Sequence, residues 1–181
     1  NSEDVVKSSL ERGVILNLVG TQYETSIEAV AMAEKFDNVY ASIGLHPTHV
    51  FFVFFNAEGV EDATNETEFD YEKYKKLAAS KKVVAIGECG LDYFRENNEE
   101  GKIRQRDAFQ RQIELSLESG LPLMLHVRNA YEDVIDILKK YPGVYGNCHF
   151  FAGTIAHAKE LLDLGFTLSF TGVITFAKQY E

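Results

Sequence analysis

The sequence is poor in cysteine, and it has no hydrophobic run long enough to cross a membrane. Its 181 residues include two cysteines, Cys89 and Cys148, which are not arranged as CxxC. So few cysteines fit a reducing compartment better than a disulfide-bonded scaffold. The apolar segment HVFFVFF at residues 49–55 is far too short to span a bilayer, and the polar first dozen residues have no signal-peptide pattern. We therefore expect a cytoplasmic protein that does not associate with membranes.

Basic residues are also few relative to acidic ones. The chain has 18 lysines and arginines against 28 aspartates and glutamates, so its net charge is −10. Long-range repulsion of polyanions counts against a generic binder of nucleic acids or anionic membranes. An acidic enzyme can still bind phosphates where metal ions and a few arginines supply local positive charge. The hydrophobic fraction of 45 % is ordinary for a globular domain.

Apolar segments alternate with helical patterns along the chain, which is typical of parallel strands joined by helices. We predict six strands, at residues 14–20, 39–43, 83–87, 121–125, 144–148 and 166–170, and five helices between them, at about 25–36, 71–80, 103–119, 131–141 and 155–164. A further helix precedes the first strand. The acidic, turn-rich segment at about residues 48–69 predicts an exposed loop insertion.

Four of the apolar segments lead to a side chain that can bind a metal ion. They are ASIGLHP with His46, VVAIGECGLDY with Glu88, LPLMLHVR with His126 and VYGNCHFFAG with His149. Because the carboxyl ends of parallel strands open to the same side, we expect these side chains to share one mouth. Imidazole and carboxylate together suit borderline or hard divalent ions. Glu88 is the most telling, since a carboxylate directly after VVAI would be costly to bury without a cation or strong partners.

Each candidate also has an ordinary structural interpretation. A single histidine at a strand end is more often a hydrogen-bonded structural residue than a ligand, and the glutamate could form an ion pair with Arg128 or a lysine. Arg128 follows His126 by two residues, so it projects the same way and could contact a phosphate. Asp92 could equally orient a ligand or cap a turn. We interpret His49 and His157 as structural or solvated.

Two folds are compatible with the alternation of strands and helices. An open doubly wound sheet usually recruits ligands from only a few strand ends, whereas a (β/α)8 TIM barrel draws them from many consecutive ends. No GxGxxG or GxxxxGK motif follows any predicted strand. We therefore predict an α/β fold of the TIM-barrel type, as a single hydrolase domain over residues 1–181. The barrel is incomplete, because eight units need about 250 residues.

Five motifs resemble, in order and with similar gaps, the successive signatures of TatD-type metal-dependent deoxyribonucleases. They are GLHP (44–47), VAIGECGLDYF (84–94), LPLMLHVRNA (121–130), HFFAGT (149–154) and LSFTGVITF (168–176). The resemblance implies a TIM-barrel hydrolase of the amidohydrolase-like class that cleaves phosphodiester bonds in DNA, often from an end. It implies DNA that is single-stranded or has free ends as the substrate; no protein partner can be inferred from the sequence.

The same resemblance implies roles for particular residues and a metal cofactor. Glu88 would bridge two divalent metal ions, His126 and His149 would complete the site of one of them, and His46 would lie beside the substrate. A phosphate contact by Arg128 is our own addition, so we name Glu88, His46 and Arg128 as catalytic. Mg²⁺ is expected first, with Mn²⁺ or Zn²⁺ as alternatives. A metal-bound water would attack phosphorus while the ions stabilise the developing charge.

The sequence departs from the family pattern at both ends. The family carries a His-x-His pair on its first strand, for the second metal ion, and an Asp on its last strand that acts as ligand and base. Neither is found in these residues. We therefore expect a fragment of a longer protein, which holds the half-site of Glu88, His126 and His149 and could be inactive by itself.

Two other classes of function stay open. One is a related metal-dependent hydrolase that acts on a small ester, amide or phosphoester, because a barrel does not fix its substrate. The other is a noncatalytic protein that uses the barrel for binding.

Overall fold

The computed structural model describes residues 2–50, 68–95 and 98–176. Most of the insertion predicted at about residues 48–69 lies outside these ranges. Within them, no helix combines the length and the apolar character that crossing a bilayer requires.

The strands form one parallel sheet. They are β1 (Leu16–Val19), β2 (Val39–Ile43), β3 (Val83–Asp92), β4 (Leu123–Arg128), β5 (Gly146–Cys148) and β6 (Phe166–Leu168). The spatial order β1-β2-β3-β4-β5-β6 follows the chain, and each strand pairs in parallel with the next. All the carboxyl ends therefore lie at the same edge, as the sequence predicts.

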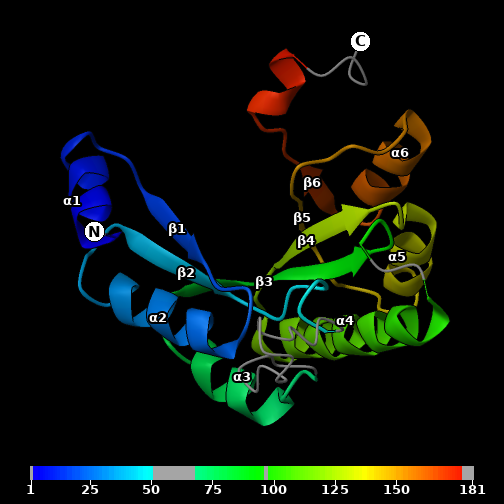
Figure 1. The fold of residues 1–181 in the computed structure, drawn as a ribbon, viewed down its shortest axis with the longest axis horizontal. Coiled ribbons are helices and arrows are strands. Elements are labelled where there is room, and N and C mark those ends of the chain that lie inside the picture. Colours follow the sequence, from blue (N-terminus) through cyan, green and yellow to red (C-terminus); the bar gives the residue numbers. More distant parts are fainter. Residues whose placement is uncertain (1, 51–67, 96–97, 177–181) are drawn as a thin grey trace, which may run out of the picture.

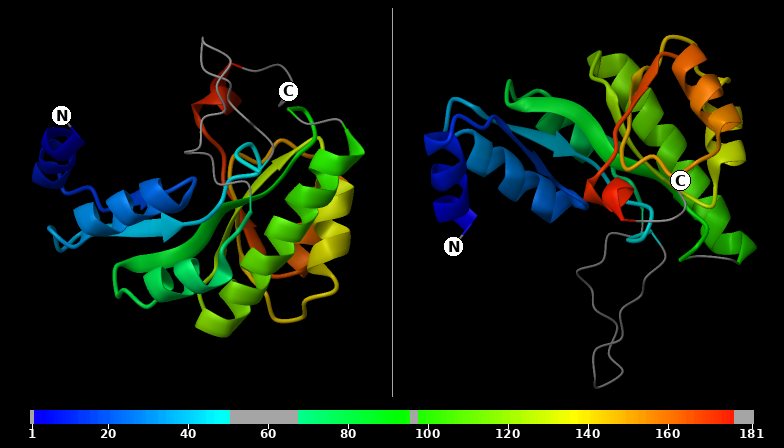
Figure 2. Two further views of the ribbon diagram at one scale, coloured as in Figure 1. Left: turned by 60° about the horizontal axis from the view of Figure 1, so that its bottom comes forward. Right: turned by 90° about the horizontal axis from the view of Figure 1, so that it is seen from above.

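One helix precedes β1 and the others follow the strands, and the connecting helices lie along the outside of the curved sheet (Figure 1). The helices are α1 (Ser2–Glu11), α2 (Tyr23–Ala33), α3 (Tyr71–Ala78), α4 (Glu99–Ser119), α5 (Tyr131–Leu138) and α6 (Ile155–Asp163), with a short 3₁₀ helix, η1 (Gly172–Thr175), after β6. The longest of them, α4, packs against β3 (Figure 2). This is the sheet-inside, helix-outside arrangement of a barrel wall.

Local sequence sets several helix ends. The side chains of Asp70, Asn98 and Thr154 each accept a hydrogen bond from a backbone N–H in the first turn of α3, α4 and α6. Such caps satisfy donors that have no partner within the helix. At the other end of α4, Gly120 adopts a left-handed conformation with φ 69°, which glycine tolerates best. The predicted end of this helix is therefore confirmed.

The core lies between the sheet and the helices. Ile86 and Leu125 on neighbouring strands, and Phe109 and Ile113 on α4, have no solvent exposure. Burying an aliphatic or aromatic side chain of this size stabilises a fold by about 1.5–3 kcal/mol. This layer fixes α4 against the strands that carry the candidate site.

Strand β3 is longer than the sequence indicates. It continues past the predicted end at Gly87 to Asp92, with a register shift against β4 between Gly87 and Cys89. Gly90 has φ 136°, and a Cβ there would lie 2.1 Å from the carbonyl oxygen of His126. Because only glycine allows this approach, β3 and β4 stay in contact along the segment that carries Glu88.

Candidate metal centre

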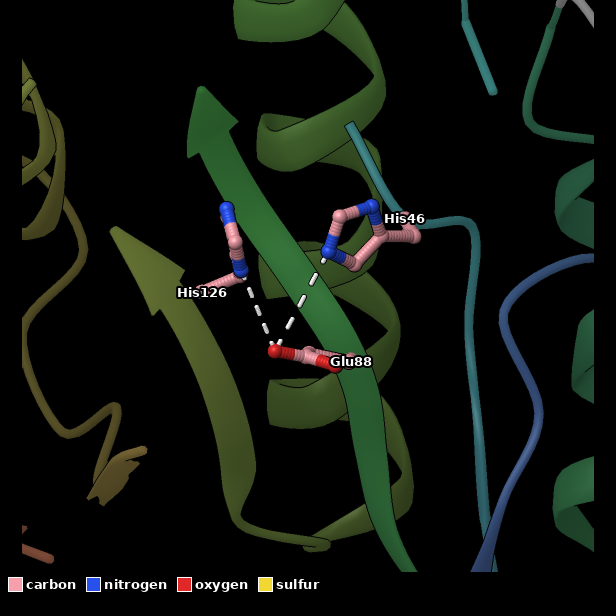
Figure 3. Close-up of side chains that lie close together, drawn as sticks. All are labelled: His46, Glu88 and His126. Carbon is pink, nitrogen blue, oxygen red and sulfur yellow. Dashed lines mark hydrogen bonds and ion pairs between the residues drawn. The ribbon is translucent and has the colours of Figure 1, made fainter. Parts of the chain in front are cut away.

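Three polar side chains from consecutive strands converge at the carboxyl edge of the sheet. His46 follows β2, Glu88 lies in β3 and His126 lies in β4, and one ligand atom of each lies within 4.8 Å of the other two (Figure 3). Oε1 of Glu88 is 3.2 Å from Nδ1 of His126 and 4.0 Å from Nε2 of His46. The two imidazole rings meet edge to face, with their centroids 4.3 Å apart. One carboxylate and two imidazoles thus face a common point.

The protein surroundings favour an ionised carboxylate in this group. Burial by itself would raise the pKa of Glu88, but the hydrogen bond with His126 and the charges of His46, His126 and His149 hold that pKa below its usual value. Burial and the neighbouring His126 lower the pKa of His46 to about 4. At neutral pH the cluster therefore offers a carboxylate oxygen and the lone pair of a neutral imidazole.

His126 has a second carboxylate partner, Asp92. Oδ2 of Asp92 lies 3.0 Å from Nε2 of His126, and its other oxygen accepts a hydrogen bond from the backbone N–H of Arg95 at 2.8 Å. The turn cap predicted for Asp92 is therefore present. Its carboxylate also contacts the ring of His126, and the predicted role of orienting a metal ligand stays a prediction. Burial would lower the pKa of His126, but the hydrogen bonds to Asp92 and Glu88 raise it to about 9. A metal ion bound at His126 would take the place of a proton.

His149 is placed near this group but outside it. It directly follows β5, and its backbone N–H donates to the carbonyl of Leu125 at 3.0 Å. Its Nδ1 lies 3.4 Å from Oγ of Ser169. Its charge still contributes to the lowered pKa of Glu88. The assignment of His149 as a metal ligand together with His126 stays a prediction.

Arg128 lies at the end of β4 with an exposed side chain. Its guanidinium carbon is 3.8 Å from the centroid of the Phe94 ring, and 58 % of Phe94 is exposed. A guanidinium that stacks on a ring keeps its N–H groups in the plane, where they can bind other acceptors. The phosphate contact assigned to Arg128 stays a prediction.

The two histidines interpreted as structural have different surroundings. His157 lies in the first turn of α6, where its Nε2 is 3.1 Å from Glu132 and its ring stacks on Tyr131. His49 lies in the turn after His46, and its Nδ1 is buried with no hydrogen-bond partner among the residues described here. Neither belongs to the group that converges on Glu88.

Sequence reasoning missed two buried glutamines behind the site. Gln105 and Gln112 on α4 are 0 % and 1 % exposed, and each forms two hydrogen bonds with the backbone of one residue, Asp92 and Leu45 respectively. The only signal in the sequence is their seven-residue spacing, which puts them on the same helix face as Phe109.

The donor set fits a divalent metal ion. Nitrogen and oxygen ligands of this kind bind Zn²⁺, Mn²⁺ and related ions, and no cysteine is among them. Asp92, on the far side of His126, has the position of the carboxylates that commonly orient metal-binding histidines.

Comparison with known proteins points in the same direction. The sequence model of the family described as TatD related DNase matches residues 1–181. The chain is 38 % identical over 176 residues to the uncharacterized metal-dependent hydrolase YabD of Bacillus subtilis, covering 96 % of this chain and 63 % of that protein. It is 33 % identical over 157 residues to the 3'-5' ssDNA/RNA exonuclease TatD of Cronobacter sakazakii, covering 84 % of this chain and 53 % of that protein.

A solved structure confirms the fold. The crystal structure of YJJV, a TatD homolog from Escherichia coli K12, matches with a TM-score of 0.74 and 27 % identity, over 96 % of this chain and 64 % of that one. The predicted α/β fold, six strands of a TIM barrel, is thereby confirmed. The chain spans less than two thirds of the length of the relatives named here.

Proposed function

This chain belongs to the TatD related DNase family of metal-dependent hydrolases, and from that premise we propose that the protein cleaves phosphodiester bonds in DNA from a free end. The observation that carries the proposal is the convergence of Glu88, His46 and His126 at the carboxyl edge of the sheet. The relative from Cronobacter sakazakii, named as an exonuclease for single-stranded DNA and RNA, supports a single-stranded substrate.

The metal ligands proposed here are Glu88, His126 and His149, and the geometry adds His46 as a further candidate. Glu88 and His126 are already in contact, and His46 lies on the other side of the same carboxylate oxygen. A divalent ion bound there would activate water and stabilise charge on the phosphate; Mg²⁺ is our first choice, with Mn²⁺ and Zn²⁺ as alternatives.

The protein's own groups have separate tasks in this proposal. The ionised Glu88 binds the cation, and Asp92 holds the ring of His126 in one orientation. The neutral imidazole of His46, when it is not a ligand, can accept a hydrogen bond from a group of the substrate. Arg128 binds a phosphate oxygen through the in-plane N–H groups that its contact with Phe94 leaves accessible.

The acidic surface does not contradict a polyanionic substrate. The net charge of −10 repels DNA at a distance, but cations at the Glu88 centre and Arg128 supply positive charge where a phosphate would sit. This predicts that DNA affinity depends on the divalent metal ion more than on the protein surface.

The test is the Mg²⁺- or Mn²⁺-dependent release of nucleotides from single-stranded DNA, measured beside small esters and phosphoesters as competing substrates. Glu88→Gln removes the charge and keeps the shape, and Glu28→Gln, an exposed position on α2, is the matched control. Release that needs the metal and disappears only in Glu88→Gln supports the nuclease. Turnover of a small ester without DNA hydrolysis would replace it with the small-molecule hydrolase, and a folded, metal-loaded protein without turnover would leave a binding protein.

A further inference from the structure

Two buried amides lie between α4 and the site. Gln105 and Gln112 are almost completely excluded from solvent, within a layer formed by apolar side chains such as Phe109 and Ile113. Burying an amide in such a layer is costly unless its hydrogen bonds are satisfied. The partners of these two side chains therefore indicate what they do.

Gln112 binds the residue that precedes His46. Its Oε1 accepts a hydrogen bond from the backbone N–H of Leu45 at 2.9 Å, and its Nε2 donates to the carbonyl of Leu45 at 3.0 Å. This pair of bonds is what a neighbouring strand would provide, but Leu45 lies beyond the end of β2 at Ile43, where the ladder with β3 has stopped. The glutamine thus supplies hydrogen bonds to Leu45 where the ladder between β2 and β3 has ended.

Gln105 binds the end of β3 in the same way. Its Oε1 accepts from the backbone N–H of Asp92 at 2.8 Å, and its Nε2 donates to the carbonyl of Asp92 at 3.2 Å. The carboxylate of that same Asp92 contacts His126. One helix therefore holds the backbone beside His46 and the backbone of the residue that contacts His126.

The chain leaves space for this contact at Gly44. A Cβ at Gly44 would lie 2.9 Å from Oε1 of Gln112 and 2.8 Å from the Cα of Gly87. Real side chains essentially never approach so closely, so the glycine lets the segment before His46 reach both α4 and β3. The close approach of Gly44 and the pair of hydrogen bonds to Leu45 are separate observations that lead to the same segment.

We propose that Gln105 and Gln112 are positioning residues, which set the positions of His46 and His126 relative to Glu88 by fixing the backbone at Leu45 and Asp92. Neither glutamine touches the metal or the substrate. The importance of these positions for metal binding rests on the proposed function. Removing either amide leaves a buried N–H and a buried C=O without partners, and the adjacent segment must move to satisfy them.

The first test is carried out on the whole chain without metal. Gln112→Met keeps the volume and removes the two hydrogen bonds to Leu45, together with a third to the carbonyl of Ala108 at 3.2 Å. Ile113→Val shortens the neighbouring buried side chain of α4 and removes no hydrogen bond. NMR contacts between the rings of His46 and His126, whose centroids are 4.3 Å apart, report the arrangement. In Gln112→Met we expect the ring contact to be lost and the Leu45 amide to exchange faster. In Ile113→Val we expect the ring contact and the exchange rate of Leu45 to match those of the unchanged chain.

Gln105→Met provides a second, independent variant. It should accelerate amide exchange at Asp92 while the Leu45 amide stays protected. Mn²⁺ titration then measures whether the changed positions weaken metal binding. The loss of groups that orient metal ligands typically weakens metal binding by about 10–100-fold. We expect at least about a tenfold loss for each Met variant and less than about a twofold loss for Ile113→Val.

The outcomes separate this inference from the proposed function. Unchanged ring contacts and unchanged amide exchange in folded Met variants would overturn the positioning role. Failure of both variants to fold would also overturn it, because the glutamines would then serve stability alone. An unchanged chain that binds no Mn²⁺, yet loses its ring contact in Gln112→Met, would overturn the metal-dependent function and keep the positioning role.

Discussion

The carboxylate of Asp92 lies 3.0 Å from Nε2 of His126, on the opposite side of the imidazole from Glu88, whose carboxylate is 3.2 Å from Nδ1. His126 is thus held at both of its ring nitrogens. Asp92 is only 1 % exposed, so its orientation is fixed by the surrounding protein.

Asp92→Asn tests the importance of this contact. The amide keeps the shape but loses the charge that holds the imidazole, so we expect Mn²⁺ affinity to fall by about 10–100-fold. Nucleotide release at limiting metal should fall with it. Isothermal titration of Mn²⁺ measures the first quantity, and Asp136→Asn, an exposed position whose carboxylate is 3.9 Å from Lys139, is the control. Equal affinity in Asp92→Asn and the control would show that the contact has no role in metal binding.

Arg128→Lys tests the proposed phosphate contact. Lysine keeps the charge but loses the planar group that stacks on Phe94, so it cannot present the same donors. We expect KM for single-stranded DNA to rise about tenfold, which corresponds to roughly 1.4 kcal/mol, while Mn²⁺ affinity stays the same. The matched change is Arg104→Lys in the exposed pair with Glu100 on α4. A drop in metal affinity without a change in KM would assign Arg128 to the metal centre instead.

Gly90→Ala tests the close contact between β3 and β4. A methyl group there would lie 2.1 Å from the carbonyl oxygen of His126, in a backbone conformation with φ 136° that favours glycine. Strain of this kind costs about 1–3 kcal/mol before the clash is counted, so we expect the free energy of unfolding to fall by at least about 2 kcal/mol. Urea unfolding measures it. Gly172→Ala, where a Cβ would meet nothing within 4 Å, should change it little; equal losses would contradict the contact.

The two cysteines should be inert in the folded protein. Cys89 and Cys148 have no solvent exposure, and burial raises the pKa of both thiols, to about 12 for Cys148. Because only the thiolate reacts, both should resist a thiol reagent at pH 8 and react after unfolding in guanidinium. The colour released by an aromatic disulfide reagent counts them. Rapid modification of one thiol in the native state would show that its segment opens more easily than its packing indicates.

The sequence predicts the sheet well because each strand is marked by a pattern of neighbouring residues. Alternating apolar and helical patterns identify all six strands, and the strand ends direct attention to His46, Glu88 and His126, which the structure brings together. The extension of β3 to Asp92 is harder to predict, since it depends on contacts between Gly90 and β4 that no local pattern shows.

Other parts of the site depend on partners far away in the chain. The role of Asp92 is set by a histidine that lies 34 residues later, and that of Gln112 by a backbone segment 67 residues earlier. A glutamine in a helix has no metal-binding character, so no motif search would select it. Only the packing of α4 against the sheet reveals the contact of Gln112 with Leu45, whereas the contact of Asp92 with His126 depends on the pairing of β3 with β4.

The distance between Gln105 and Gln112 also limits how this protein can change in length. Seven residues of α-helix advance about 10 Å and complete almost two turns, so both amides face the strands. One residue inserted between them would rotate one amide by about 100° relative to the other, and only one could keep its partner. Insertions should therefore be tolerated in the loops between elements and rejected in this stretch of α4, which acts as a fixed spacer between the ends of β2 and β3.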